Sequence, residues 1–173
     1  MNIMIEQVQK DARLPAEDEV EVLTFNLNDE VFALEAIRVQ EILDVLPETR
    51  VPGAARFAGS VINFRGRVIP LADLRLAFGM EAVSTTIDSR IVVIELDLKG
   101  EPTLIGLRTD KVNEVTTLAK ANGEPPPSVG MRWRADFIDG LFKREGDFII
   151  LPNLTAIFNQ NDASMAAASR SIN

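Results

Sequence analysis

An internal repeat is the feature that most constrains the fold of this chain. Residues Phe57–Phe78 align without gaps on Phe137–Phe158, and Phe32–Ile42 align in the same way on Ile105–Val115. The first alignment contains six identical pairs in 22 positions: Phe57/Phe137, Gly66/Gly146, Ile69/Ile149, Leu71/Leu151, Leu74/Leu154 and Phe78/Phe158. The chain therefore consists of two copies of one unit. Because each copy has only about 60–70 residues, near the lower limit for an independent core, we expect the copies to pack on each other.

The periodicity within each copy predicts short β-strands. Apolar and polar residues alternate over residues 20–27, and Asn28-Asp29 then gives a turn signal before an apolar run returns. A second hairpin is predicted over 61–69 with Gly66 in its turn, and Arg90–Leu98 has the strongest strand pattern. So many short strands in so small a unit favour a mainly β fold of two small barrels over one open sheet.

Helices are expected to be short in this chain. Pro70 is predicted to open an amphipathic helix that Gly79 closes, and its apolar face consists of Leu71, Leu74 and Phe78. Residues 36–46 fit either a helix or a short helical turn followed by a strand, and both interpretations stay open here. Ala119–Val129, which contains three consecutive prolines, is predicted to be a long loop.

The patterns divide the chain into a folded part and two ends. Residues 1–19 are polar and acidic without a sustained period, and we expect them to form a mobile leader. The folded part is expected over 20–158, with the first barrel mainly in 20–88 and the second mainly in 89–158. An exchange of strands between the two barrels is left open. Residues 159–173 are expected to be a frayed or weakly helical tail.

Composition limits the chemistry that the chain can perform. Its 173 residues include no Cys, His or Tyr, which removes disulfides, thiolate nucleophiles, histidine bases and the usual zinc sites. The 18 Lys and Arg against 26 Asp and Glu give a net charge of −8, which argues against nucleic acid as the main partner. No apolar run approaches the roughly 18 residues that a membrane span needs, and residues 1–10 do not resemble a signal peptide. We therefore expect a cytoplasmic location.

The two copies differ at one hairpin tip. A difference of this kind can indicate a function that belongs to one copy alone. Asn63-Phe64-Arg65-Gly66 corresponds to Lys143-Arg144-Glu145-Gly146, so only the glycine is shared and turn geometry explains it. Arg65 can be read as a solvated charge or as the ion-pair partner of Glu41. The second copy keeps a glutamate at 114 but has Glu145 in place of Arg65, which predicts that the pair is not repeated there. We expect Phe64 to be an exposed aromatic residue of a contact surface.

Catalysis would have to depend on carboxylates or hydroxyl and amine groups. The available acidic groups are the run Glu17-Asp18-Glu19 and the pair Asp136 and Asp139. Acid–base catalysis needs two carboxylates that converge in one cleft with separated pKa values, and no spacing here predicts that arrangement. Solvated surface charge is the favoured interpretation, and an enzyme remains a minor alternative.

The longest specific motif resembles a known family. The run from Phe57 to Arg75, which contains Ser60-Val61-Ile62-Asn63-Phe64-Arg65-Gly66-Arg67-Val68-Ile69-Pro70-Leu71, is similar to the central motif of the CheW family of bacterial chemotaxis coupling proteins. Phe32-Ala33-Leu34, Val39-Gln40-Glu41-Ile42 and Val112-x-Glu114-Val115 match other family segments in order and spacing. The resemblance extends from about Val20 to Phe158. It departs from the family pattern at Ser60, where the family usually has Gly.

The resemblance implies a fold and a function. The family fold is two tandem five-stranded SH3-like β-barrels related by a pseudo-two-fold axis. Its members are adaptors without catalytic residues, cofactors or metals, and they link the cytoplasmic tips of methyl-accepting receptors to the regulatory domain of the histidine kinase CheA. The resemblance thus implies a protein that is monomeric in isolation and multivalent in membrane-associated receptor arrays. A scaffold for a different sensory kinase, or a small-barrel module that binds peptides by strand addition, is the alternative within binding proteins.

The resemblance also implies a coupling surface. Val39 and, less directly, Val112 correspond to the groove that meets the receptor, although ordinary core is the favoured interpretation of either valine taken alone. Glu41 and Arg65 correspond to a charged pair near that surface. Asn63, Phe64 and Gly66 complete the hairpin motif.

Overall fold

The computed structural model describes residues 17–127 and 134–160 of the chain. The greater parts of the leader predicted over 1–19 and of the tail predicted over 159–173 lie outside these ranges. Within them, Glu19 is already the first residue of strand β1, and residues 154–160 form a helix. No helix of the described ranges is long and apolar enough to cross a membrane.

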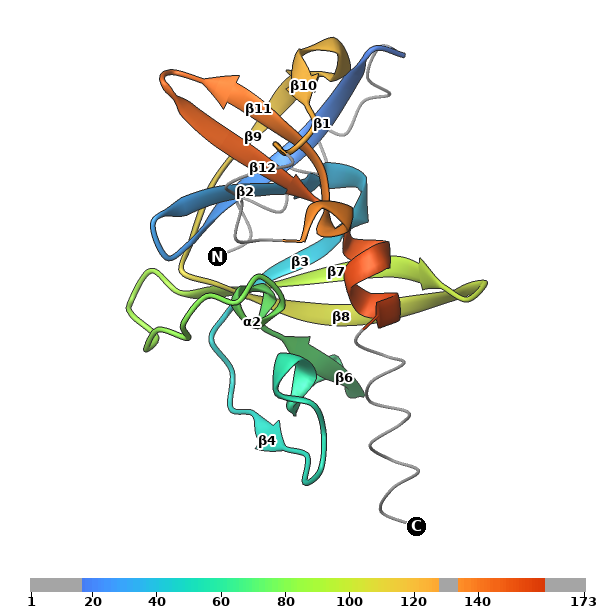
Figure 1. Cartoon of the computed structure of the whole chain (residues 1–173). Helices are drawn as coiled ribbons and strands as arrows, with labels where there is room; N and C mark the ends of the chain where they lie inside the picture. The colour runs from blue at the N-terminus through green and yellow to red at the C-terminus, as the bar shows by residue number, and fades with distance from the viewer. Residues whose placement is uncertain (1–16, 128–133, 161–173) are drawn as a thin grey trace.

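The predicted mainly β fold is confirmed, and the strands form two curled six-stranded sheets (Figure 1). In spatial order, the first sheet contains β10 (Gly123–Glu124), β11 (Ile138–Arg144), β12 (Asp147–Pro152), β2 (Glu30–Glu35), β1 (Glu19–Leu27) and β9 (Lys111–Ala119). The second sheet contains β3 (Val39–Asp44), β7 (Arg90–Leu98), β8 (Glu101–Thr109), β6 (Arg67–Ala72), β5 (Ser60–Phe64) and β4 (Thr49–Arg50). The sixth strand of each sheet, β10 or β4, has only two residues and adds to the five expected.

The strands of each sheet do not all come from one side of residue 88, where the sequence analysis divided the two barrels. Strand β3 follows β2 in sequence but pairs with β7 of the other sheet, and β9 follows β8 but pairs with β1. The second sheet is thus built from residues 39–109, and the first from 19–35 together with 111–152. Each copy contributes its first two strands, β1–β2 or β7–β8, to one sheet and its remaining four strands to the other, so both halves of the sequence contribute to each sheet.

The internal repeat appears as matching local structure. The hairpins β5–β6 and β11–β12 occupy equivalent places, and each is preceded by a 3₁₀ turn that contains Phe57 or Phe137. Strand β6 pairs in parallel with β8, and β12 pairs in parallel with β2. A short helix then ends each copy, α2 (Leu74–Ala77) in the first and residues 154–160 in the second.

Two local predictions need correction, and one open alternative is decided. Pro70 does not open a helix but lies inside β6 opposite Val61, because the hairpin with β5 keeps the chain extended to Ala72. Helix α2 begins only after Asp73, whose side chain accepts a hydrogen bond from the Arg75 N–H and so caps it.

The ambiguous segment 36–46 is resolved into the 3₁₀ turn Ala36–Arg38 followed by β3. The loop predicted over 119–129 is structured in its first part, and residues 128 and 129 lie outside the described ranges. Strand β9 extends to Ala119, the 3₁₀ turn Lys120–Asn122 follows, and β10 pairs with β11. Glycine at 123 permits this pairing because a Cβ there would lie 2.8 Å from the Phe142 ring.

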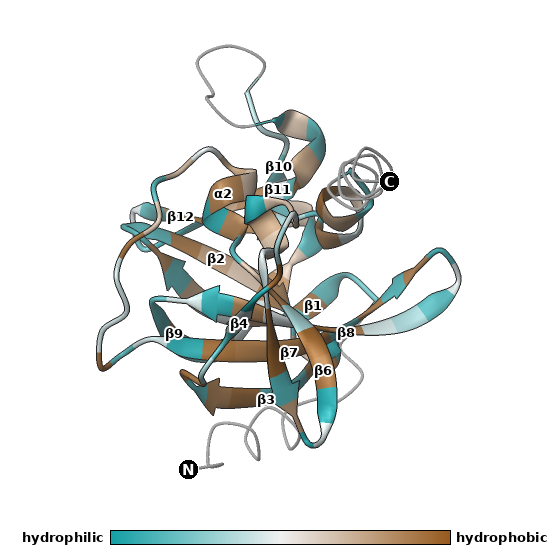
Figure 2. Ribbon diagram, turned by 90° about the horizontal axis from the view of Figure 1, so that it is seen from below, coloured by the Kyte–Doolittle hydropathy of each residue, from teal (hydrophilic) through white to brown (hydrophobic). Residues whose placement is uncertain are grey.

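One hydrophobic core serves both sheets. It joins Phe25 and Phe32 of the first sheet to Val92 and Ile94 of the second, and all four side chains are fully buried. Figure 2 shows these hydrophobic stretches in brown along strands such as β3 and β7. The Phe57 and Phe158 rings, from the start of one repeat and the end of the other, lie 5.0 Å apart by centroid. The copies therefore pack on each other as their size predicts.

A buried charge cluster also connects the sheets. The guanidinium of Arg75 is buried and donates hydrogen bonds to Asp73 at 3.0 Å and to Asp110 at 2.8 Å. Asp110 also accepts from the backbone N–H of Asn28, in the β1–β2 turn, at 2.5 Å. Burial lowers the pKa of Arg75, but the hydrogen bonds and charges of the two aspartates outweigh it and raise the pKa above its ordinary value. Arg75 therefore stays charged and ties α2 to the opposite sheet.

Candidate functional site

The tip of the β5–β6 hairpin is a two-residue turn with a conformation suited to glycine. Arg65 and Gly66 have φ angles of 52° and 80°, the left-handed pair that a tight hairpin turn requires. The side-chain oxygen of Asn63 accepts a hydrogen bond of 2.9 Å from the Gly66 N–H. Asn63 and Gly66 thus fix the shape of the turn, and this shape presents Arg65.

Arg65 forms an ion pair with Glu41 on strand β3. The Nη2–Oε2 distance is 2.8 Å, and the two side chains are 69% and 11% exposed. The structure therefore brings together two of the predicted site residues that are 24 positions apart in sequence. Because the carboxylate is nearly buried while the guanidinium is open to solvent, Arg65 keeps donors that can reach a partner.

Phe64 does not lie on the surface as predicted. Its side chain is only 7% exposed and packs with Ile62, Ile69 and Ile91 in a small hydrophobic cluster of the second sheet. The physical reason is that alternate residues of β5 face inward, so Ile62 and Phe64 share the covered face while Asn63 faces out. Phe64 still supports the site from below, since the Arg65 guanidinium lies 5.1 Å from the centroid of its ring.

The two valines of the predicted surface lie at equivalent places on different sheets. Val39 begins β3 and is buried in the shared core, while Val112 on β9 is partly buried against the same core. Each valine is followed by a β-bulge, which is one extra residue in the strand. In β3 the register against β7 shifts between Val39 and Glu41. In β9 the register against β1 shifts between Val112, which faces Phe25, and Val115, which faces Leu23. Such bulges redirect the following side chains, here the glutamate at 41 or 114.

The second copy does form a corresponding ion pair, which corrects the prediction made from Glu145. Glu114 pairs with Arg144 at 3.2 Å, one residue before the position equivalent to Arg65. Glu145 itself takes the left-handed turn conformation with a φ of 50°. The pair is less covered than its counterpart, because the Glu114 side chain is 57% exposed against 11% for Glu41.

The two aspartates considered for catalysis have different surroundings. Asp136 is held by Arg134 at 2.5 Å, and this hydrogen bond lowers its pKa. The pKa of Asp139 is raised, first by burial of its carboxyl and then by the charge of Glu35, with Asn153 opposing by a hydrogen bond. Asp139 is nonetheless exposed as a residue. Within the described ranges, no three acidic or histidine side chains are grouped to hold a metal ion.

Sequence reasoning missed several charged residues of the second sheet. Arg108 forms an ion pair with Glu48, and the same carboxylate also accepts a hydrogen bond from Ser60. Arg50 and Arg56 lie in the same region. The one signal in the sequence that pointed to this region was Ser60, which stands where the family usually has Gly.

Comparisons with known proteins agree with this architecture. A family model described as "CheW-like domain" matches residues 21–162. "Chemotaxis protein CheW" of Rhizobium meliloti is 30% identical over 146 residues, which covers 84% of this chain and 92% of the relative. The protein of the same name from Klebsiella aerogenes is 27% identical over 145 residues, 84% of this chain and 85% of the relative.

A solved structure gives the same result. The crystal structure of the scaffolding protein TtCheW from Thermoanaerobacter tengcongensis matches with a TM-score of 0.72 and 30% identity, over 85% of this chain and 91% of that one. Since the family model spans most of the chain and the two-sheet fold agrees with a member's structure, this protein belongs to the CheW-like domain family.

Proposed function

We propose that this chain is a non-catalytic chemotaxis adaptor that couples methyl-accepting receptors to the histidine kinase CheA. The observation that carries the proposal is the family match over residues 21–162, joined to relatives named as chemotaxis proteins and to a scaffolding protein of the same fold. We further infer a cytoplasmic protein that is recruited to membrane receptor arrays, through the regulatory domain of CheA and the receptor tips.

Arg65 is the centre of the proposed receptor-coupling surface. Its guanidinium is 69% exposed, yet the turn, the Phe64 ring and the Glu41 carboxylate restrict where it lies. A charged group that is held in place before binding loses less conformational entropy when a partner arrives. Val39 and Val112 contribute to this surface only through the core that supports it, because neither side chain is freely exposed.

The pseudo-symmetric architecture suits an adaptor that joins three components. Two similar sheets place similar edges at two places on one molecule, and each edge can meet a related domain of the kinase, so that repeated contacts close into a ring. The surface that carries Arg65 and Glu41 is then left for a receptor helix. Individually weak contacts become stable in an array because neighbouring components hold each other at high effective concentration.

A two-step experiment tests the proposal. Calorimetry with the purified CheA regulatory domain from the same source should give saturable one-to-one binding, and the variant Arg65→Glu should keep it. In a reconstituted assay, Arg65→Glu should then reduce the receptor-controlled change in kinase activity by roughly tenfold or more, because it places like charge beside Glu41 and reverses the charge offered to the receptor.

The second hairpin provides the matched control. Arg144→Glu makes the same charge reversal beside the equivalent glutamate, and it should leave receptor control close to that of the unmodified protein. The double variant Glu41→Arg with Arg65→Glu restores the ion pair and should recover stability but not coupling. Equal losses in Arg65→Glu and Arg144→Glu would contradict a surface specific to one hairpin. Absence of CheA binding at high micromolar concentration would point instead to a scaffold for another sensory kinase.

A further inference from the structure

Five arginines gather around two adjoining cavities of the second sheet, in a chain whose net charge is −8. The cavities have volumes of about 220 and 210 Å³, and both are lined by Arg56, Asp73 and Arg108. We call this region the arginine cleft and define it by Arg50, Arg56, Arg75, Arg90 and Arg108. These residues come from five different elements, so the cluster is a product of the tertiary fold.

The arginine cleft has more positive than negative charge. Five arginines line it, against the three carboxylates of Glu48, Asp73 and Asp110. Three of the arginines have acidic partners: Arg75 pairs with Asp73 and Asp110, Arg90 with Asp44, and Arg108 with Glu48. The side chains of Arg50 and Arg56 have no ion pair or hydrogen bond with the described residues, and both residues are exposed. Two guanidinium groups are therefore free to bind an anion.

The floor of the cleft is held in a fixed arrangement. Arg108 uses one Nη group for Glu48, and its other N–H groups have no partner within the described part of the chain. The Ser60 hydroxyl also donates a hydrogen bond to the Glu48 carboxylate, which helps to keep Arg108 in place. Arg108 on β8, Arg50 on β4 and Arg56 on the 3₁₀ turn before β5 all line the second cavity, so three sets of guanidinium donors border one space.

We propose that the arginine cleft binds the phosphate group of a small, freely diffusing anion. Guanidinium groups make paired, charge-assisted hydrogen bonds to phosphate oxygens, and a tetrahedral dianion offers acceptors to three arginines at once where a planar carboxylate does not. Each cavity is smaller than the roughly 300 Å³ at which sites for drug-sized ligands begin, so the site fits a compact ligand. This site lies at the start of β5, away from the hairpin tip that carries Arg65, and it does not depend on the proposed adaptor function.

Calorimetric titration with sodium pyrophosphate, at constant ionic strength, tests the site. The unmodified protein should bind saturably at one site. Arg56→Ala and Arg50→Ala should each weaken binding roughly tenfold, the loss expected for one charge-assisted hydrogen-bonding group. Neither side chain has a partner within the described residues, so both variants should unfold at the same temperature as the unmodified protein.

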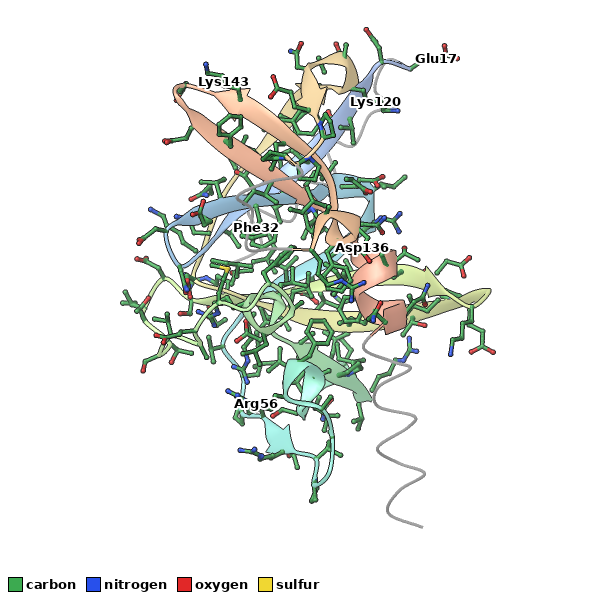
Figure 3. The ribbon with its side chains drawn as sticks, viewed as in Figure 1. Glu17, Phe32, Arg56, Lys120, Asp136 and Lys143 are labelled. Carbon is green, nitrogen blue, oxygen red and sulfur yellow. The ribbon has the colours of Figure 1, made fainter. Side chains whose placement is uncertain are left out.

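Lys143→Ala is the control variant, because it also removes one positive charge from an exposed position. Figure 3 shows Lys143 on the β11–β12 hairpin at one end of the molecule and Arg56 near β4 at the other. Its pyrophosphate affinity should match that of the unmodified protein. The proposal is overturned by absence of saturable binding, by an equal loss in Lys143→Ala, or by equal binding of acetate at the same ionic strength.

Discussion

Glu48 shows how a single departure from the family motif changes the electrostatics of one residue. Burial raises the pKa of this carboxyl, but hydrogen bonds from Arg108 and Ser60 and the charge of Arg108 outweigh burial, so the pKa lies below its ordinary value. A glycine at position 60 could not supply the hydroxyl. Ser60 therefore stabilises the ionised form of Glu48, and through it the position of Arg108.

We predict that Ser60→Ala raises the pKa of Glu48 toward its ordinary value. Because the folded-state pKa is lowered, this carboxyl stabilises the fold above the unfolded-state pKa near 4.5, and the contribution is lost as pH falls through the lower folded-state value. The variant should lose less stability than the unmodified protein over that acidic range. Carbon-detected NMR titration of the Glu48 carboxyl measures the shift, and an unchanged pKa would contradict the hydrogen bond. Asp136, whose pKa Arg134 lowers, should not change and serves as an internal reference.

At the scale of elements, the two hairpins share one turn conformation but carry different side chains in the turn. Gly66 and Gly146 have φ angles of 80° and 88°, and the residues before them, Arg65 and Glu145, have 52° and 50°. A Cβ at either glycine would meet no atom within 4 Å, so a substitution there would affect only the backbone conformation. The turn is therefore shared, while the charge that it presents differs between the copies.

We predict that Gly66→Ala and Gly146→Ala each destabilise the protein by about 1–2 kcal/mol, the cost of a left-handed conformation for a residue with a Cβ. Urea denaturation should give similar values for both. Gly66→Asn should cost less, because asparagine tolerates this conformation better than alanine. Val68→Ala, an exposed change in the same hairpin, should stay within about 0.5 kcal/mol. A cost for Gly66→Ala no larger than that of Val68→Ala would show that the turn can rearrange.

At the scale of the whole molecule, the crossed strands and the shared core make the two sheets interdependent. Strands β3 and β9 each lie in the sheet opposite to their preceding hairpin, and Phe25 and Phe32 pack in the same core as Val92 and Ile94. Arg75 adds a charged connection from α2 to Asp110, which in turn binds Asn28 of the first sheet. Neither sheet can unfold without exposing part of the core of the other.

We predict a single cooperative unfolding transition. In differential scanning calorimetry the calorimetric and van't Hoff enthalpies should agree, as for a single domain. Phe32→Ala should lower the stability by about 3–5 kcal/mol, because it removes a buried ring from the shared core, and it should shift the one transition without dividing it. Two separate transitions in either protein would mean that the sheets fold independently.

The sequence by itself determined the features that depend on a few neighbouring residues. The repeat located both hairpins and their glycines, and the alternation over residues 20–27 and 90–98 located long strands. It also paired Glu41 with Arg65 as one of two interpretations, and the ion pair is present. These predictions succeeded because turn geometry and the period of a strand are properties of the local backbone.

Only the tertiary structure decided which distant side chains meet. It buried Phe64 in a cluster with Ile91, supplied Arg144 as the partner of Glu114, and gathered Arg50, Arg56 and Arg108 into one cleft. It also sent β3 and β9 to opposite sheets. The physical reason is that a side chain's neighbours depend on which strands pair and in which register, and shared core packing selects that pairing over the whole chain.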